Sequence, residues 1–253
     1  MDTQLLNEIA INAGKEILRI YNDESLSQNV DYKSDNSPLT LADKASNEVI
    51  VKALQQLFPK IPILSEEEKH VEYEERKHWE KFWLVDPLDG TKEFIKRNGE
   101  FTVNIALIEQ GFPVLGIIYA PVLDKLYVGD SKINQAYMID PDGNEHRLRV
   151  NLKQSARIAV GSRSHSSTEE VELLSKYDVV ETISIGSSLK FCMVAEGRAD
   201  IYYRHGPTME WDTGAGQVIV EAAGGTVDYM ETQNRFSYNK ENLLNGSFLV
   251  KGF

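Results

Sequence analysis

The sequence predicts an α/β protein, built as one large domain or two closely joined ones. The first observation is a pair of amphipathic helical patterns near the N-terminus, followed by four short apolar segments with the β-branched content of strands. The second is an alternation of strand-like and helix-like segments in the second half, which is typical of α/β structure. The third is length, because 253 residues are enough to bury a substantial core.

Apolar residues at helical spacing define the two N-terminal helices. In the first helix they are Leu5, Leu6, Ile9, Ala13, Ile17 and Tyr21; in the second, which ends at Pro59, they are Ala42, Ala45, Val49, Ala53, Leu54 and Leu57. The strand-like segments that follow are IPIL at 61–64, FWLV at 82–85, TVNIALI at 102–108 and VLGIIYA at 114–120. Between the last two, EQG at 109–111 predicts the turn of a hairpin.

The second half predicts alternating elements. They are, in order, IAV at 158–160 as a strand, a helix over 168–177, TISI as a strand, SSLKFCMVAEG as a helix, ADIYYR as a strand, WDTGAGQVIVEAAGG as a helix and FLVK as the last strand. The preceding segment, about 125–155, is polar and loosely patterned. We therefore expect a subdomain boundary there, between an N-terminal α+β subdomain, 1–130, and a C-terminal α/β subdomain, 131–253.

Composition restricts the class of partner. The chain has 39 acidic and 27 basic residues and a net charge of −12, whereas nucleic-acid polymers are bound by a surplus of Lys and Arg. A small phosphorylated ligand stays compatible if local cations offset the surrounding field. No apolar run approaches the ~20 residues of a membrane span, and the N-terminus lacks the pattern of a signal peptide. The single cysteine, Cys192, excludes an internal disulfide, so we expect a cytoplasmic protein.

The segment FWLVDPLDGTKEF holds the most informative motif. An apolar strand ends in Asp86, and Asp89 follows three residues later, so the two carboxylates and the Leu88 carbonyl can converge on one point. Such oxygens are what Mg²⁺ accepts. Gly90 and Thr91 then open a short helix whose N–H groups suit a phosphate. The structural alternative is an ordinary Asp-Pro and Asp-Gly turn.

Three further acidic sites accompany this motif. LSEEE places Glu66 and Glu67 just after a strand, although the same residues could begin a solvated acidic loop. WDTGAG places Asp212 at a helix start, where a capping role is the alternative. SPLTLAD gives Thr40 and Asp43 the spacing of a capping box, and capping is the first explanation of that pair.

LSEEE, DPLDGT and WDTGAG, in this order, resemble the signature of the inositol monophosphatase superfamily of lithium-sensitive, metal-dependent phosphatases, and the resemblance covers essentially the whole chain. DNSPLTLAD, DGTKEF, SRSH, GSSLKF and the segment ending in EWDT are most similar to the CysQ-type 3′(2′),5′-bisphosphate nucleotidases within it. The resemblance implies a layered αβαβα sandwich of the inositol monophosphatase/fructose-1,6-bisphosphatase type, with its metal site in a cleft between two subdomains.

The resemblance also implies site residues, carried over position by position. The implied metal ligands are Glu66, Asp86, the Leu88 carbonyl, Asp89 and Asp212, with Asp86 bridging two Mg²⁺ ions and Glu67 near a weaker third. The implied catalytic residues are Asp43 and Thr91, which would orient and deprotonate a water, together with Glu66. The implied substrate-binding residues are Gly90, Thr91, His165, Ser187, Lys190, Arg204 and Asp212. Read alone, Lys190 and Arg204 could be solvated surface residues and His165 a turn residue.

The activity implied is Mg²⁺-dependent hydrolysis of adenosine 3′,5′-bisphosphate to AMP and phosphate, with 3′-phosphoadenylyl sulfate as a second substrate, clearing a by-product of sulfate assimilation. The expected partner is therefore a small nucleotide bisphosphate, and the chain is expected as a monomer or homodimer without a transmembrane segment. One alternative is an inositol monophosphatase acting on sugar or polyol phosphates, which the GSSLKF and SRSH segments argue against. A nucleotide-binding regulator without turnover is another, which the complete acidic set argues against. Some relatives are described at the cytoplasmic face of the inner membrane, but no anchor is evident in this sequence.

Overall fold

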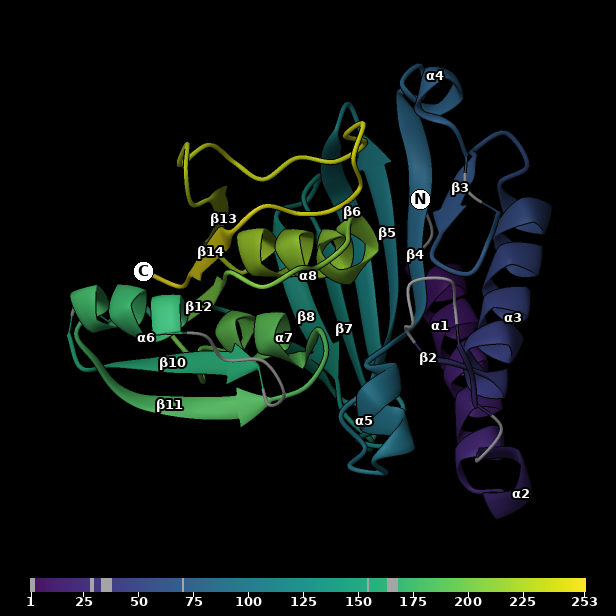
Figure 1. The fold of residues 1–253 in the computed structure, drawn as a ribbon, viewed down its shortest axis with the longest axis horizontal. Helices are drawn as coiled ribbons and strands as arrows, with labels where there is room; N and C mark the ends of the chain where they lie inside the picture. The colour runs from purple at the N-terminus through teal and green to yellow at the C-terminus, as the bar shows by residue number, and fades with distance from the viewer. Residues whose placement is uncertain (1–2, 28–29, 33–37, 70, 154, 163–167) are drawn as a thin grey trace.

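The computed structural model describes residues 3–27, 30–32, 38–69, 71–153, 155–162 and 168–253. Its elements form five layers, with helices on the outside, two sheets, and a pair of helices between the sheets (Figure 1). The predicted αβαβα sandwich is therefore confirmed.

Two long helices form the first layer. They are α1 (Thr3–Tyr21) and α3 (Leu41–Leu57), which pack against each other and cover one face of the larger sheet (Figure 1). Most of each predicted apolar stripe faces the protein interior, where α1 buries Leu6, Ile9, Ala13 and Ile17, but Leu5 and Leu57 are exposed. Short elements border this layer: α2 (Glu24–Ser27), β1 (Val30–Tyr32) and β2 (Pro38–Thr40).

The larger sheet has seven strands in sequential order. They are β3 (Ile63–Ser65), β4 (Lys81–Asp89), β5 (Thr102–Glu109), β6 (Phe112–Ala120), β7 (Lys125–Asp130), β8 (Gln135–Ile139) and β9 (Glu145–Arg147), with α4 (Tyr73–Arg76) and α5 (Thr91–Ile95) in the connections. The predicted hairpin between β5 and β6 is confirmed. The strands β7 to β9 lie in the segment that the sequence had suggested as loosely patterned. Strand β7 pairs with β6, β8 with β7 and β9 with β8, so they extend the sheet.

The second sheet has five strands in the order β11-β10-β12-β14-β13. They are β10 (Arg157–Ser162), β11 (Val179–Ile185), β12 (Ile201–Arg204), β13 (Thr226–Tyr229) and β14 (Phe248–Lys251). Helix α6 (Thr168–Leu174), followed by a 3₁₀ turn at Ser175–Tyr177, lies outside this sheet, and α7 (Leu189–Ala195) and α8 (Glu210–Ala222) lie between the sheets (Figure 1). The chain passes from one sheet to the other between β9 and β10, while the division into subdomains at residue 130 stays a prediction.

Helix α8 approaches the larger sheet very closely. A Cβ atom on Gly116 of β6 would lie 2.6 Å from the Ala215 carbonyl oxygen, and one on Gly129 of β7 would lie 2.5 Å from the Ile219 Cα. Glycine at these two positions therefore lets the helix backbone rest directly on the strands. This seating fixes where the first turn of α8, with Asp212, meets the ends of β4 and β5.

The connection from β13 to β14 joins the two halves. The fully buried guanidinium of Arg76 donates to the carbonyls of Lys240 and Glu241, at 2.6 and 2.8 Å. The fully buried carboxylate of Glu210 accepts the N–H groups of Asn239 and Lys240, at 2.7 and 2.9 Å. The start of α8 is thus held to both halves. None of the helices in the described part of the chain combines the length and apolar character that crossing a bilayer requires.

Candidate active site

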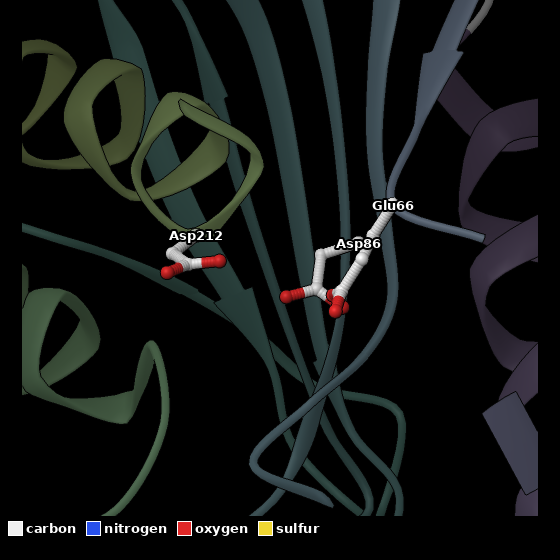
Figure 2. Close-up of side chains that lie close together, drawn as sticks. All are labelled: Glu66, Asp86 and Asp212. Carbon is white, nitrogen blue, oxygen red and sulfur yellow. The ribbon is translucent and has the colours of Figure 1, made fainter. Parts of the chain in front are cut away.

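Three carboxylates meet where β3, β4 and α8 come together. Glu66 follows β3, and its N–H donates to the Val85 carbonyl of β4 at 3.1 Å. Asp86 lies on β4 just before the irregularity in its pairing with β5, and Asp212 is the third residue of α8. Oxygen atoms of Glu66, Asp86 and Asp212 all lie within 4.8 Å of one another, and Figure 2 shows them converging on one point.

These carboxylates repel one another strongly. Burial raises the pKa of Asp86 well above its ordinary value, and the charges of Glu66 and Asp89 raise it further. Burial likewise raises the pKa of Asp212, with Asp89 and Glu66 adding to the shift. A cation would remove this conflict, because ionised oxygens at short separation are the ligands of hard divalent metals. The residues present therefore fit a metal centre.

Asp212 does not cap its helix in the way that its sequence context suggested. Met209 is the N-cap of α8, and Asp212 at the third position accepts the Met209 N–H at 2.8 Å. One oxygen of its carboxylate thus fixes the side chain against the helix start.

The Thr40 and Asp43 capping box is present, and the same carboxylate also contacts Thr91, although Asp43 itself is not among the described residues that line the cleft. The Oδ2 atom of Asp43 accepts the Thr40 N–H at 2.7 Å, while its Oδ1 atom accepts the Thr91 hydroxyl at 3.2 Å. Burial raises the pKa of Asp43, and the hydrogen bonds from Thr40 oppose this shift. Capping and a role at the site are therefore compatible in one residue.

A cleft of about 320 Å³ opens beside the carboxylates, at the lower end of the size range for small-molecule sites, roughly 300–1,000 Å³. Ten of the residues expected at the site line it: Glu66, Asp86, Leu88, Asp89, Gly90, Thr91, Ser187, Lys190, Arg204 and Asp212. We call Glu66, Asp86, Asp89 and Asp212 the acidic wall and Lys190 with Arg204 the cationic wall.

The cationic wall is buried. Lys190 and Arg204 each have a relative exposure of only 7%, so the alternative that they are solvated surface residues is wrong. Burial lowers the pKa of Lys190 to about 8, although the nearby charge of Asp89 opposes the shift. Its Nζ atom donates to the Ser187 carbonyl at 2.6 Å.

Two predicted site residues, Glu67 and His165, are not among the described residues that line the cleft. Glu67 is half-buried in the turn after β3 and is not among the described residues that line the cleft, so its role at a third ion stays a prediction. His165 lies outside the described residues. The acidic loop alternative fits Glu68, which is exposed, better than Glu66.

Sequence reasoning missed the polar residues behind Asp89. Ser188 donates to Asp89 Oδ2 at 2.6 Å and accepts from Asn104 Nδ2 at 2.8 Å. The doubled serine in GSSLKF was a signal for Ser188. Asn104 lies in the middle of an apolar strand. Its contact with Ser188, 84 positions further along the chain, has no signal in the sequence around it.

The chain belongs to the inositol monophosphatase family, whose sequence model matches residues 2–251. The predicted resemblance is thereby confirmed. A 3′(2′),5′-bisphosphate nucleotidase CysQ of Salmonella typhimurium is 47% identical over 243 residues, which are 96% of each chain. The protein of the same name from Escherichia coli strain K12 is 45% identical over the same length and coverage. The crystal structure of CysQ from Bacteroides thetaiotaomicron, with 42% identity, superposes with a TM-score of 0.86, covering 100% of this chain and 98% of that one.

Proposed function

We infer that this chain is a metal-dependent 3′(2′),5′-bisphosphate nucleotidase that hydrolyses adenosine 3′,5′-bisphosphate to AMP and phosphate. The observation that carries the inference is the pairing, in one cleft, of an acidic wall with a buried cationic wall. A nucleotide bisphosphate has two phosphates, one for the acidic wall with its metal and one for the cationic wall. The names of the relatives at 45–47% identity support the same activity.

Glu66, Asp86, Asp89, Asp212 and the Leu88 carbonyl are the residues that would hold the metal, proposed as two Mg²⁺ ions, with a third near Glu67. When bound, such ions activate water and stabilise the charge that develops on the transferring phosphoryl group. The geometry that supports this proposal is the convergence of three carboxylates within 4.8 Å, because Mg²⁺ prefers oxygen ligands.

Thr91 and Asp43 are proposed to move the proton. Hydrolysis forms a bond from a water oxygen to the 3′-phosphorus and breaks the bond from phosphorus to O3′, which takes up a proton from solvent as it leaves. The attacking water must lose a proton. Thr91 Oγ1 can accept it while passing its own proton to Asp43 Oδ1, 3.2 Å away. Because burial raises the pKa of Asp43, its carboxylate is a stronger base than an exposed one.

Lys190 and Arg204 are proposed to bind the 5′-phosphate, which takes no part in the reaction. Ser187, Gly90 and the described backbone around them would complete the site, and His165 is proposed for the nucleotide on resemblance alone. A net charge of −12 makes local cations necessary for any ligand with two phosphates.

The test is phosphate release from adenosine 3′,5′-bisphosphate and from inositol 1-phosphate, measured side by side with purified protein. We expect Mg²⁺-dependent release that strongly favours the bisphosphate, and an Asp86→Asn variant purified identically should show none. Preference for inositol 1-phosphate would replace the proposed function with that of a polyol phosphatase. Binding of the bisphosphate without release would replace it with that of a regulator.

Other features of the proposal rest on family resemblance. They are activity on 3′-phosphoadenylyl sulfate, inhibition by lithium, a place in sulfur metabolism, a cytoplasmic location and a monomeric or homodimeric state. The same phosphate-release assay, with lithium added or with the second substrate, tests the first two.

A further inference from the structure

The carboxylate of Asp89 accepts hydrogen bonds from the hydroxyl groups of two consecutive residues in the other half of the molecule. Ser187 Oγ donates to Asp89 Oδ2 at 2.9 Å, and Ser188 Oγ donates to the same oxygen at 2.6 Å. The second distance lies within the range for a hydroxyl bonded to an ionised carboxylate, roughly 2.5–2.7 Å. Both bonds fall on one oxygen, so they fix the rotation of the carboxylate about its Cβ–Cγ bond.

The proton of Ser188 is directed by a third residue. Asn104 Nδ2, on β5, donates to Ser188 Oγ at 2.8 Å, and an amide nitrogen can only donate. The single proton of the hydroxyl is therefore left for an acceptor, and the acceptors within reach are Asp89 Oδ2 at 2.6 Å and the Asp212 carbonyl at 3.0 Å. The charged oxygen makes the stronger bond. The Thr102 hydroxyl lies 3.0 Å from Asn104 Oδ1 and 2.6 Å from Ser187 Oγ, so its single proton can be donated to either oxygen.

The backbone before α7 is shaped to present these hydroxyls. Ser187 has a φ of 56°, in the left-handed region that non-glycine residues rarely adopt. A Cβ atom on Gly186 would lie 2.9 Å from the Glu100 carbonyl oxygen, so glycine is needed for the chain to pass so close. The Gly186 N–H is bonded to Glu100 Oε2 at 2.8 Å. Local strain held by surrounding contacts is typical of functional sites.

We propose that Ser188 is a positioning residue of the metal centre. Its hydroxyl orients Asp89, from the larger sheet, and at the same time contacts the Asp212 carbonyl at the start of α8, so that ligands from the two halves assemble in one geometry. The proposal rests on the proposed function, because it takes Asp89 and Asp212 as metal ligands. Outer hydrogen-bond partners of this kind typically change metal affinity by about 10- to 100-fold when removed.

Binding of Mn²⁺ to the metal-free protein, followed by electron paramagnetic resonance of the free ion, tests this proposal without an activity assay. Ser188→Ala should weaken the binding step that involves Asp89 roughly 10- to 100-fold. Asn104→Ala, which keeps the hydroxyl but removes the donor that directs it, should give a smaller loss in the same direction. Ser131→Ala is the matched control, because its hydroxyl bonds only to the Val114 carbonyl among the described residues, far along the chain from the site.

A double-mutant cycle separates positioning from general loosening of the structure. In an Asp89→Ala background, Ser188→Ala should have almost no further effect on Mn²⁺ affinity, because the carboxylate that it orients is gone. If Ser188→Ala lowers the Mn²⁺ affinity equally in the wild-type and Asp89→Ala backgrounds, the proposal is overturned. It is also overturned if Ser188→Ala leaves the Mn²⁺ affinity unchanged while Asp89→Ala lowers it. In both of those cases the proposed function stands. Unchanged affinity in Asp89→Ala itself would overturn the ligand assignment and this proposal together. If Ser188→Ala fails to fold, judged by circular dichroism, Asn104→Ala decides the question in the same cycle.

Discussion

Burial shifts the pKa values of the acidic wall and of the cationic wall of the cleft in opposite directions. On the acidic wall, burial and mutual repulsion raise the pKa of Asp86 and of Asp212. On the cationic wall, burial lowers the pKa of Lys190 to about 8. Burial therefore shifts Asp86 and Asp212 toward their neutral forms, whereas Lys190, with a pKa of about 8, keeps most of its charge at pH 7. A ligand of opposite charge favours the ionised form, which means cations for one wall and a phosphate for the other.

This difference assigns a separate task to each wall. The acidic wall, on the ends of β3 and β4 and the start of α8, would hold the ions and the reacting phosphate. The cationic wall, on α7 and the end of β12, would select a substrate with a second phosphate. If the tasks are separate, damage to the acidic wall should abolish reaction on every substrate, while damage to the cationic wall should change selectivity.

The largest effect is expected from Asp89→Asn. Loss of a charged oxygen from a hard-cation site should cut kcat by about 10⁴-fold or more, since ions contribute several kcal/mol of charge stabilisation and each 1.4 kcal/mol is tenfold. Steady-state phosphate release at saturating Mg²⁺ measures it, on the bisphosphate and on adenosine 3′-monophosphate. Retention of more than about a tenth of wild-type kcat would remove Asp89 from the acidic wall.

Thr91→Ala should have the next largest effect. A positioned proton-transfer group contributes roughly 10²–10⁴-fold, so kcat should fall by that order while the affinity for Mg²⁺ changes little. Single-turnover kinetics, which isolate the chemical step, are the appropriate measurement. An unchanged rate would leave Thr91 and Asp43 as a turn residue and a helix cap.

Lys190→Ala and Arg204→Ala should act on selectivity. A hydrogen bond to a charged group contributes about 1.5–3 kcal/mol, so either change should lower kcat/KM for the bisphosphate by about 10- to 100-fold. Hydrolysis of adenosine 3′-monophosphate should change far less, because it lacks the second phosphate. Equal losses on both substrates would mean that the cationic wall does not read that phosphate.

An effect on stability instead of activity is expected in the pH dependence of the metal-free protein. Because the pKa values of Asp86 and Asp212 are raised in the folded state, their stabilising effect is present below the unfolded pKa and is lost as pH rises. Thermal unfolding without metal should therefore show stability falling as pH rises above about 4, the ordinary pKa of an aspartate, at up to about 1.4 kcal/mol per pH unit for each proton.

The cationic wall should change stability in the opposite direction at higher pH. The pKa of Lys190, lowered to about 8, lies below that of the unfolded chain, so stability should rise again between about pH 8 and pH 10. Saturating Mg²⁺ should abolish the fall near neutral pH, since metal binds the ionised carboxylates. A metal-free protein whose stability rises steadily from pH 5 to pH 7.5 would contradict the raised pKa values.

The sequence predicted the residues of the acidic wall better than the residues that hold them in place by hydrogen bonds. Asp86 and Asp89 lie within one strand end, where a local motif contains the information. Ser188, just before α7, and Asn104, on β5, are 84 positions apart in the chain and meet only in the folded structure. The strands β7 to β9 were missed for a related reason. Strand β9 is exposed throughout and has no apolar pattern, and each of the three strands pairs with the strand before it in the sheet, which local sequence does not indicate. Motifs thus predicted ligands, while tertiary packing determines their orientation.

The most direct test of the division between the walls is a crystal structure of the protein with Mn²⁺ and AMP, which keeps only the 5′-phosphate. We expect anomalous scattering from manganese at the carboxylates of Glu66, Asp86 and Asp212, and the phosphate of AMP at Lys190 and Arg204. Manganese away from these carboxylates, or an AMP phosphate on the metal ions with no contact to Lys190 and Arg204, would contradict the assignment of the two walls.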